Sequence, residues 1–351
     1  MTDVIVIGGG IAGISVAARL SEHASVTLIE AETALGYHAS GRSAALFEEN
    51  YGAPSVVALS RASAADHQPY LSPRGLLLLA RAGEDELFLK DAKALQCPEI
   101  PLAEASARVP ILNDRITRAA YHEGAQDIDT DRMMQDMAKT LRANGGRIRT
   151  GAPVTAIART RTWQVHLTDE RLTCDVLINA AGAWADQIAN MAGVRPIGLT
   201  PCRRSMARIP APGGQDVSNW PIFFGVGETW YAKPDAGKLL VSPADEDPVD
   251  PHDAWADDMV LAEGLDRYAQ HVTEPVTRVE TTWAGLRSFA PDRTLVLGAD
   301  PMQPSFFWCA GQGGYGFQTA PAASRLVVDL ALGRPPEIDA TTVKSLSPAR
   351  F

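Results

Sequence analysis

A glycine-rich turn near the start of the chain has the residue types and spacing that can hold a pyrophosphate. Val4–Ile7 is a continuous apolar run typical of a buried strand, and the G-x-G-x-x-G pattern Gly8–Gly13 follows it directly. Gly8 permits the tight turn, Gly10 lets the backbone approach the phosphates, and Gly13 lets the next helix pack closely on the strand. This context predicts an adenine dinucleotide rather than a glycine-rich turn without a ligand.

A second strand and an acidic residue complete this fingerprint. Val26–Ile29 ends at Glu30 and Ala31, where a carboxylate can accept hydrogen bonds from ribose hydroxyls. The helix opens at Ile11 and Ala12, and the free amides of a helix N-terminus attract phosphate oxygens. The beginning of the chain therefore predicts one βαβ nucleotide-binding unit.

Two further glycine-containing segments favour FAD over NAD. Gly41–Ala44 is interpreted as a second helix N-terminus that could hold the rest of a long cofactor. Gly311–Gly316 opens the last predicted helix, and its amides could face the negative end of a reduced flavin. Since the sequence shows a single βαβ nucleotide-binding unit and no second one for a separate NAD site, a pyridine nucleotide is not expected as a co-substrate.

Composition and charge narrow the possible partners. The 351 residues predict about two domains, and 46% hydrophobic with 21% charged residues is typical of globular proteins. The net charge of −10, from 32 basic and 42 acidic residues, argues against nucleic acid, because a phosphate-binding surface is basic. Four scattered cysteines without a C-x-x-C pair predict reduced thiols, with neither a disulfide framework nor a metal site.

The sequence predicts no transmembrane segment. The longest apolar run, Val4–Leu20, is interrupted by the glycines of the turn, and Thr2 and Asp3 precede it where a signal peptide has a basic leader. We therefore expect a cytoplasmic protein, with peripheral attachment to the inner face of the membrane left open.

The order of predicted elements indicates an α/β fold with a Rossmann-like FAD-binding domain that is discontinuous in sequence. Nucleotide-binding segments occur at the beginning, middle and end, so we expect this domain to comprise residues 1–46, 124–200 and 281–351. Residues 47–123 and 201–280 would form an inserted α+β substrate-binding domain. Its antiparallel sheet is predicted to contain the strands Ser205–Ile209, Phe223–Val226, Thr229–Ala232 and Lys238–Ser242.

Several motifs in the same order resemble the FAD-dependent D-amino-acid oxidase and glycine oxidase superfamily. These are Gly8–Gly13, Gly36–Ala45, Ile178–Trp184, Thr282–Phe289 and Gly311–Thr319. Within it, the chain is most similar to the D-arginine dehydrogenases over nearly its whole length. The resemblance implies non-covalent FAD, because Trp283–Pro291 lacks the cysteine to which sarcosine oxidases attach flavin. The residues expected to contact FAD are Gly8, Gly10, Ile11, Ala12, Gly13, Glu30, Ala31, Arg42, Ser43, Ala44, Val154, Ala181, Gly182, Trp184, Gly285, Gly311, Gly313, Gly314, Tyr315, Gly316, Phe317 and Gln318.

The resemblance also implies a reaction. A hydride passes from the α-carbon of an amino acid to flavin N5, and water hydrolyses the imino acid to a 2-oxo acid and ammonia. A guanidinium meets a carboxylate in a two-point fork, which fixes the direction of the Cα–H bond. Arg204 and Arg287 match the carboxylate-binding arginines, with a one-residue ambiguity between Arg203 and Arg204. The other expected substrate contacts are Tyr51, Tyr231, Gly285 and Gln318.

Departures from the D-arginine dehydrogenases predict a different side-chain preference. Leu46 stands where they have histidine, and Leu76 stands where a glutamate faces the substrate guanidinium. The wall residues Ile222 and Phe224 are apolar, and a buried cation facing them would cost several kcal/mol. We therefore expect D-amino acids with neutral or apolar side chains. Glu48 could restore a carboxylate from another direction, although a solvent-facing position is favoured.

Other functions remain open at this point. One is oxidation of a secondary amine (sarcosine- or glycine-like) or of a 2-hydroxy acid, and another is a non-catalytic flavoprotein subunit. A flavin domain for RNA modification is disfavoured by the acidic charge. His38 is interpreted as structural rather than as a base. The electron acceptor, quinone or oxygen, and the oligomeric state do not follow from the sequence.

Overall fold

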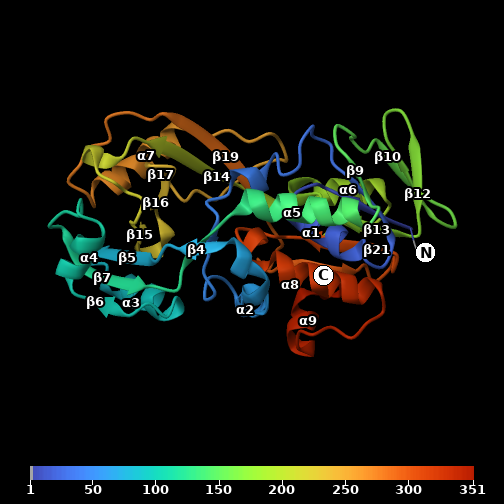
Figure 1. The fold of residues 1–351 in the computed structure, drawn as a ribbon, viewed down its shortest axis with the longest axis horizontal. Coiled ribbons are helices and arrows are strands. Elements are labelled where there is room, and N and C mark those ends of the chain that lie inside the picture. The colour runs from blue at the N-terminus through green and yellow to red at the C-terminus, as the bar shows by residue number, and fades with distance from the viewer. Residues whose placement is uncertain (1–2) are drawn as a thin grey trace.

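A computed structural model describes residues 3–351. Its two main sheets lie side by side along the long axis of the molecule (Figure 1). The smaller sheet has six strands in the order β20-β21-β13-β1-β2-β9. Its strands are parallel apart from β20, which runs antiparallel to β21. Their bounds are β1 (Asp3–Ile7), β2 (Ser25–Ile29), β9 (Arg147–Arg149), β13 (Val176–Asn179), β20 (Val296–Ala299) and β21 (Phe306–Ala310). This is the predicted Rossmann-like arrangement.

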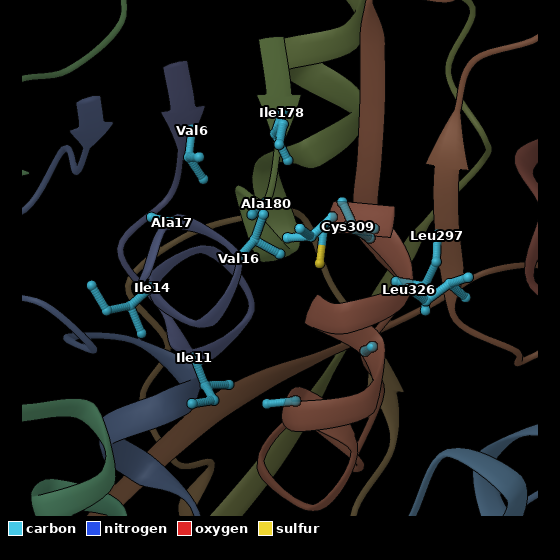
Figure 2. Packing of buried hydrophobic residues seen from close by; sticks show 14 of the residues in the cluster. Val6, Ile11, Ile14, Val16, Ala17, Ile178, Ala180, Leu297, Cys309 and Leu326 are labelled. Carbon is cyan, nitrogen blue, oxygen red and sulfur yellow. The ribbon is translucent and has the colours of Figure 1, made fainter. Parts of the chain in front are cut away.

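Helix α1 (Ile11–Leu20) lies in the core of this part of the molecule. Its side chains are buried almost all round, because α5 (Thr130–Ala143) and α8 (Gly316–Ala331) pack on the face that β1 and β2 leave free. Figure 2 shows Val16 between Ala180 and Cys309, with Leu326 of α8 on the far side of the cluster. Asp129 caps α5 by accepting a hydrogen bond from the Arg132 amide, as predicted.

The second, larger sheet, which we call the large sheet, carries strands from both predicted inserted segments. It also carries β19, which the predicted domain division places in the FAD-binding domain. Its order is β18-β14-β17-β16-β15-β5-β7-β6, and β19 pairs with β14. The four strands predicted to form an antiparallel sheet correspond to β14–β17 and are antiparallel to their neighbours among these four. The exception in the sheet is the pair β5 and β15, which is parallel. The bounds are β5 (Leu76–Arg81), β6 (Glu99–Ile100), β7 (Ile116–His122), β14 (Thr200–Ile209), β15 (Ile222–Gly225), β16 (Tyr231–Asp235), β17 (Lys238–Ser242), β18 (Asp247–Pro248) and β19 (Thr281–Phe289).

The parallel pair has a simple origin. β5 and β15 come from the two separate inserted segments, so no tight hairpin joins them and either direction is open to them. Helices α3 (Asp85–Ala94), α4 (Leu102–Arg108) and α7 (Asp258–Ala269) cover parts of this sheet (Figure 1). No helix in residues 3–351 is long and apolar enough to cross a membrane.

The remaining elements connect or flank the two sheets. The predicted hairpin is confirmed as β10 (Ala156–Arg159) and β11 (Trp163–His166), and β12 (Arg171–Cys174) extends it to three strands. A small sheet joins β3 (Leu46–Phe47), β8 (Gln126–Ile128) and β4 (Leu71–Pro73). The short helices are α6 (Ala185–Met191) and α9 (Ala340–Leu346).

Helix α2 (Pro54–His67) was not predicted. Its sequence is rich in alanine and serine, so its apolar face is weakly marked. Although the predicted domain division groups it with the substrate-binding segments, α2 packs against α8, and its Val56 and Leu59 join the core around α1.

The prediction of a helix N-terminus at Gly41–Ala44 is wrong. A single 3-10 turn, Ala39–Arg42, ends there, and Ser43 continues in extended conformation toward β3. Arg42 explains why no helix follows, because its guanidinium donates to the carbonyls of Ala254 and Ala284 and so draws this segment across to β19.

Candidate active site

A cavity of about 870 Å³ runs from the carboxyl ends of β1 and β2 to one face of the large sheet. This volume is typical of cofactor and ligand sites. Most of the predicted site residues line it, whereas Gly13, Gly311 and Tyr315 do not. Those that line it are Gly8, Gly10, Ile11, Ala12, Glu30, Ala31, Arg42, Ser43, Ala44, Leu46, Glu48, Tyr51, Leu76, Val154, Ala181, Gly182, Trp184, Arg204, Ile222, Phe224, Tyr231, Gly285, Arg287, Gly313, Gly314, Gly316, Phe317 and Gln318.

The glycine turn can only be built from glycine. Gly8 has φ +108°, and a Cβ there would lie 2.3 Å from the carbonyl oxygen of Ala180. A Cβ on Gly13 would lie 1.8 Å from the carbonyl oxygen of Gly8, so Gly13 sets how closely α1 approaches β1. These contacts leave the amide end of α1 open toward the cavity, which is the geometry that a pyrophosphate needs.

The acidic residue of the fingerprint is held in place by the backbone. Glu30 accepts hydrogen bonds from the amides of Gly9 at 2.6 Å and Glu32 at 2.8 Å, and it lines the cavity at the end of β2. The Ile11 amide at the start of α1 donates to the Ser40 hydroxyl at 2.9 Å. The residues present therefore fit the adenosine and pyrophosphate parts of a dinucleotide.

Charged side chains fix the segment that follows the fingerprint. His38 contacts Glu32 at 3.0 Å, and its ring lies 4.6 Å from that of Trp184. His38 also lines the cavity, and its structural role stays a prediction. Further along, the buried ammonium of Lys233 donates to the Ala44 carbonyl at 2.7 Å. These contacts tie the loop around the middle of the cavity to both sheets.

The two predicted arginines come together because of strand register. Cys202 lies opposite Arg287 and Arg204 lies opposite Gly285 in the β14–β19 pair. Since side chains alternate along a strand, Arg204 shares the face of Cys202 and is therefore a diagonal neighbour of Arg287. Both side chains line the cavity.

The same alternation settles the ambiguity between the two adjacent arginines. Arg203 points to the opposite face, where its guanidinium lies 3.4 Å from Asp245 and 2.8 Å from Asp247. Arg203 does not line the cavity. Arg204 is therefore the arginine that the fold brings to the site.

Apolar residues from neighbouring strands form the wall beside the arginines. Leu76 lies opposite Ile222, and Phe224 lies opposite Tyr231, so these four side chains share the face that carries Arg204. All four are buried and line the cavity. The opposite face packs a separate aromatic core around Phe223.

The sequence did not single out Glu228, a carboxylate at the centre of the arginine pair. It accepts hydrogen bonds from Arg204 at 3.1 Å and from the Tyr51 hydroxyl at 2.9 Å, and it lies 3.8 Å from Arg287. Its backbone has φ +51°, which turns the chain back just before β16. The only available signal was its position in a Gly-Glu turn three residues before Tyr231.

Charges in this cluster are arranged unevenly. Arg204 also pairs with Glu246 at 3.1 Å, so its guanidinium faces two carboxylates. Within residues 3–351, the side chain of Arg287 makes no hydrogen bond; its one ion-pair contact is Glu228. Arg204 keeps one donor, the buried Nε, without a partner, whereas no nitrogen of the Arg287 guanidinium donates to a residue of this range, so Arg287 has more donors left for a ligand.

Burial and neighbouring charges keep these groups in fixed protonation states. Burial, and then the Glu228 carboxylate, raises the pKa of both Tyr51 and Tyr315 above the ordinary value. Burial alone would lower the pKa of Arg287, but Tyr51, Tyr231 and Glu228 outweigh it and raise that pKa. The phenols therefore stay neutral donors and Arg287 stays a cation.

Two other predicted residues have partners that the sequence did not reveal. Glu48 is 2% exposed, so the expectation of a solvent-facing glutamate is wrong; Asn50 and His122 hold it inside. Gln318 lines the cavity, and its side-chain amide donates to the Tyr51 carbonyl at 3.3 Å and the Ser60 hydroxyl at 3.1 Å. It therefore positions the segment that carries Tyr51.

Removing the charge of Glu228 is expected to strengthen binding of anions. Glu228→Gln leaves the two arginines with one carboxylate fewer, so a simple carboxylate such as benzoate should bind roughly tenfold more tightly. Isothermal titration calorimetry on the FAD-loaded protein measures this directly. Glu263→Gln, at an exposed position of α7 outside the cavity, is the matched control. Equal or weaker binding by Glu228→Gln would contradict the competition between Glu228 and an anionic ligand.

Comparison with known proteins agrees with this geometry. Residues 3–330 match the model of the family described as FAD dependent oxidoreductase. This chain belongs to that family of FAD-dependent oxidoreductases, and its cofactor is FAD.

Individual proteins are similar to this chain in sequence or in fold. Glycine oxidase of Pseudomonas aeruginosa is 27% identical over 96% of this chain and 96% of its own length. FAD-dependent oxidoreductase domain-containing protein 1 of Bos taurus is 24% identical over 94% of this chain and 81% of its length. Two solved structures share the fold, each with a TM-score of 0.85. Glycine oxidase from Geobacillus kaustophilus is 21% identical over the whole of both chains. L-proline dehydrogenase from P. horikoshii is 20% identical over 100% of this chain and 97% of its own chain.

Proposed function

We propose that this protein catalyses the oxidative deamination of a D-amino acid with a neutral side chain. The observation that carries the proposal is the Arg287 guanidinium, which faces the cavity beside Tyr51 and Tyr231 with its hydrogen-bond donors unused by residues 3–351. A permanently charged planar fork in a largely buried site is well suited to a substrate carboxylate.

The residues of the chain would act by binding and orientation. Arg287 would hold the carboxylate through two parallel N–H donors, and the Tyr231 hydroxyl would donate to the same group. The Tyr51 hydroxyl donates to Glu228 in this structure and would turn from Glu228 to the substrate carboxylate. Arg204, already bound to Glu228 and Glu246, would fix the charge balance of the cluster. Bound FAD supplies the acceptor for the hydride of Cα, and water then converts the imino acid to a 2-oxo acid and ammonia.

The side-chain preference rests on the wall of the cavity. Leu76, Ile222 and Phe224 offer apolar surface, and each buried methylene gains about 0.8 kcal/mol. The D configuration rests on the similarity to D-arginine dehydrogenases. Similar folds include glycine oxidase and an iminodiacetate oxidase, so a smaller or secondary amine is the alternative that the same arginine could bind.

Anaerobic reduction of the flavin by matched D- and L-amino acids tests the proposal. We expect the flavin absorbance to bleach with D-leucine, D-phenylalanine and D-methionine, and far more slowly with their L forms and with D-arginine. Glycine, sarcosine and 2-hydroxy acids belong in the same panel. The proposal fails if no D-amino acid reduces the flavin while one of these other compounds does, or if none does.

A further inference from the structure

Glu48 is a buried glutamate in a part of the cavity where several leucines lie. It is 2% exposed and lines the cavity together with Leu46, Leu76 and Leu95. A carboxylate taken out of water is costly unless donors surround it. Its presence among leucines, beside the proposed substrate, therefore calls for a physical reason.

The donors around Glu48 satisfy most of its acceptor sites. One oxygen, Oε1, accepts from the amide of Asn50 at 3.0 Å and from its side-chain Nδ2 at 3.1 Å. The other, Oε2, lies 2.8 Å from Nδ1 of His122. A carboxylate has about four lone-pair sites, so one site on Oε2 has no partner within residues 3–351.

His122 reaches Glu48 from the strand next to the apolar wall. It lies opposite Leu76 across the β5–β7 pair, on the face that carries Ile222, Phe224 and Tyr231. Near it, burial, followed by the Glu48 carboxylate, raises the pKa of the Cys97 thiol to about 12, so that this neighbour is neutral. Glu48 therefore presents its oxygens beside the face that carries the apolar wall, next to a neutral thiol.

We propose that Glu48 selects a substrate whose apolar side chain ends in a single neutral hydrogen-bond donor, as a phenol or an indole does. The inference rests on the proposed function, because it places the amino-acid side chain against the wall formed by Leu76, Ile222 and Phe224. A group with one donor fills the remaining site on Oε2 and leaves nothing else unsatisfied.

Cationic side chains fit this arrangement poorly. An ammonium brings three donors and a guanidinium five, whereas Glu48 has one site without a partner and the leucines beside it have none. Asp91 and Asn50, which also line the cavity, already accept from the Gly227 amide and from Arg61. The remaining donors of a cation would lose water without gaining a partner, and this loss offsets the attraction between the cation and the carboxylate. The number of hydrogen-bond donors at the end of the side chain therefore favours tyrosine- and tryptophan-like substrates over lysine and arginine.

Binding of two acids that differ by one hydroxyl tests the inference without relying on turnover. The FAD-loaded protein is titrated with 3-phenylpropanoate and 3-(4-hydroxyphenyl)propanoate by calorimetry. We expect the hydroxylated acid to bind roughly tenfold more tightly to the wild type, and this ratio to fall close to one in Glu48→Gln. Glu49→Gln, the same change at the exposed next residue outside the cavity, should keep the ratio.

Turnover gives a second readout. D-tyrosine should exceed D-phenylalanine in kcat/KM in the wild type, and D-lysine should fall below D-norleucine. Equal binding of the two acids by the wild type, an unchanged ratio in Glu48→Gln, or a preference for D-lysine overturns the role of Glu48. If the variant does not retain FAD, the wild-type ratio decides alone. Absence of any flavin reduction counts against the proposed function. In that case the affinity ratio of the two acids still decides whether Glu48 binds a side-chain donor.

Discussion

Replacing Arg287 by alanine should lower kcat/KM for every substrate by roughly 100- to 1,000-fold, because truncating one partner of a buried charge pair costs about 2–5 kcal/mol. The loss arises from two sources. The substrate carboxylate loses its fork, and the orientation of the Cα–H bond is no longer fixed. Stopped-flow reduction of the flavin under anaerobic conditions measures both affinity and the rate of reduction.

Two controls separate binding of substrate from damage to the fold. Arg287→Ala should retain FAD, because the guanidinium lies on β19 of the large sheet, away from the glycine turn. Arg161→Ala, at an exposed turn between β10 and β11, should behave as the wild type. An Arg287→Ala protein that keeps full FAD and full activity would refute the proposed carboxylate site.

Gly13→Ala is expected to abolish FAD binding and to lower the free energy of unfolding by about 3 kcal/mol or more. The added methyl would stand 1.8 Å from the carbonyl oxygen of Gly8, which is backbone and cannot rotate aside. α1 would have to move away from β1, and this displaces the amides that face the cavity. Flavin absorbance of the purified protein and chemical denaturation measure the two effects.

Gly145→Ala supplies the comparison for this substitution. Gly145 has φ +83° in the turn after α5, and no atom lies within 4 Å of the position of its added Cβ. The change there should cost only the left-handed backbone, about 1 kcal/mol, with FAD retained. If Gly13→Ala were no more harmful than Gly145→Ala, close packing of α1 on β1 would not be what requires glycine.

Local patterns were sufficient for the nucleotide half of the fold. A strand, a glycine turn and a helix follow one another directly between Asp3 and Leu20, so local sequence determines their structure. α2 was missed because its stability comes from packing on α8, far away in sequence, rather than from a marked apolar stripe. The helix expected at Gly41–Ala44 failed for a similar reason, since Arg42 contacts carbonyls more than 200 residues away.

The same distinction holds in the site. Arg204 and Arg287 could be named from motifs, but their meeting depends on the register of two strands that are distant in sequence. Glu228 was missed, because a Gly-Glu turn three residues before Tyr231 does not by itself indicate that the carboxylate folds back between the two arginines. The burial of Glu48 depends on His122, which comes from a different strand altogether.

The long ladder between β14 and β19 has a mechanical consequence. It is paired without a break from Thr200 opposite Phe289 to Arg208 opposite Thr281, and both arginines sit within it. The ladder holds the backbones of Arg204 and Arg287 at a fixed separation, because moving them apart would break ladder hydrogen bonds on both sides of the site. Ligands of different size must therefore be accommodated by the opposite wall, while the anchoring end stays rigid.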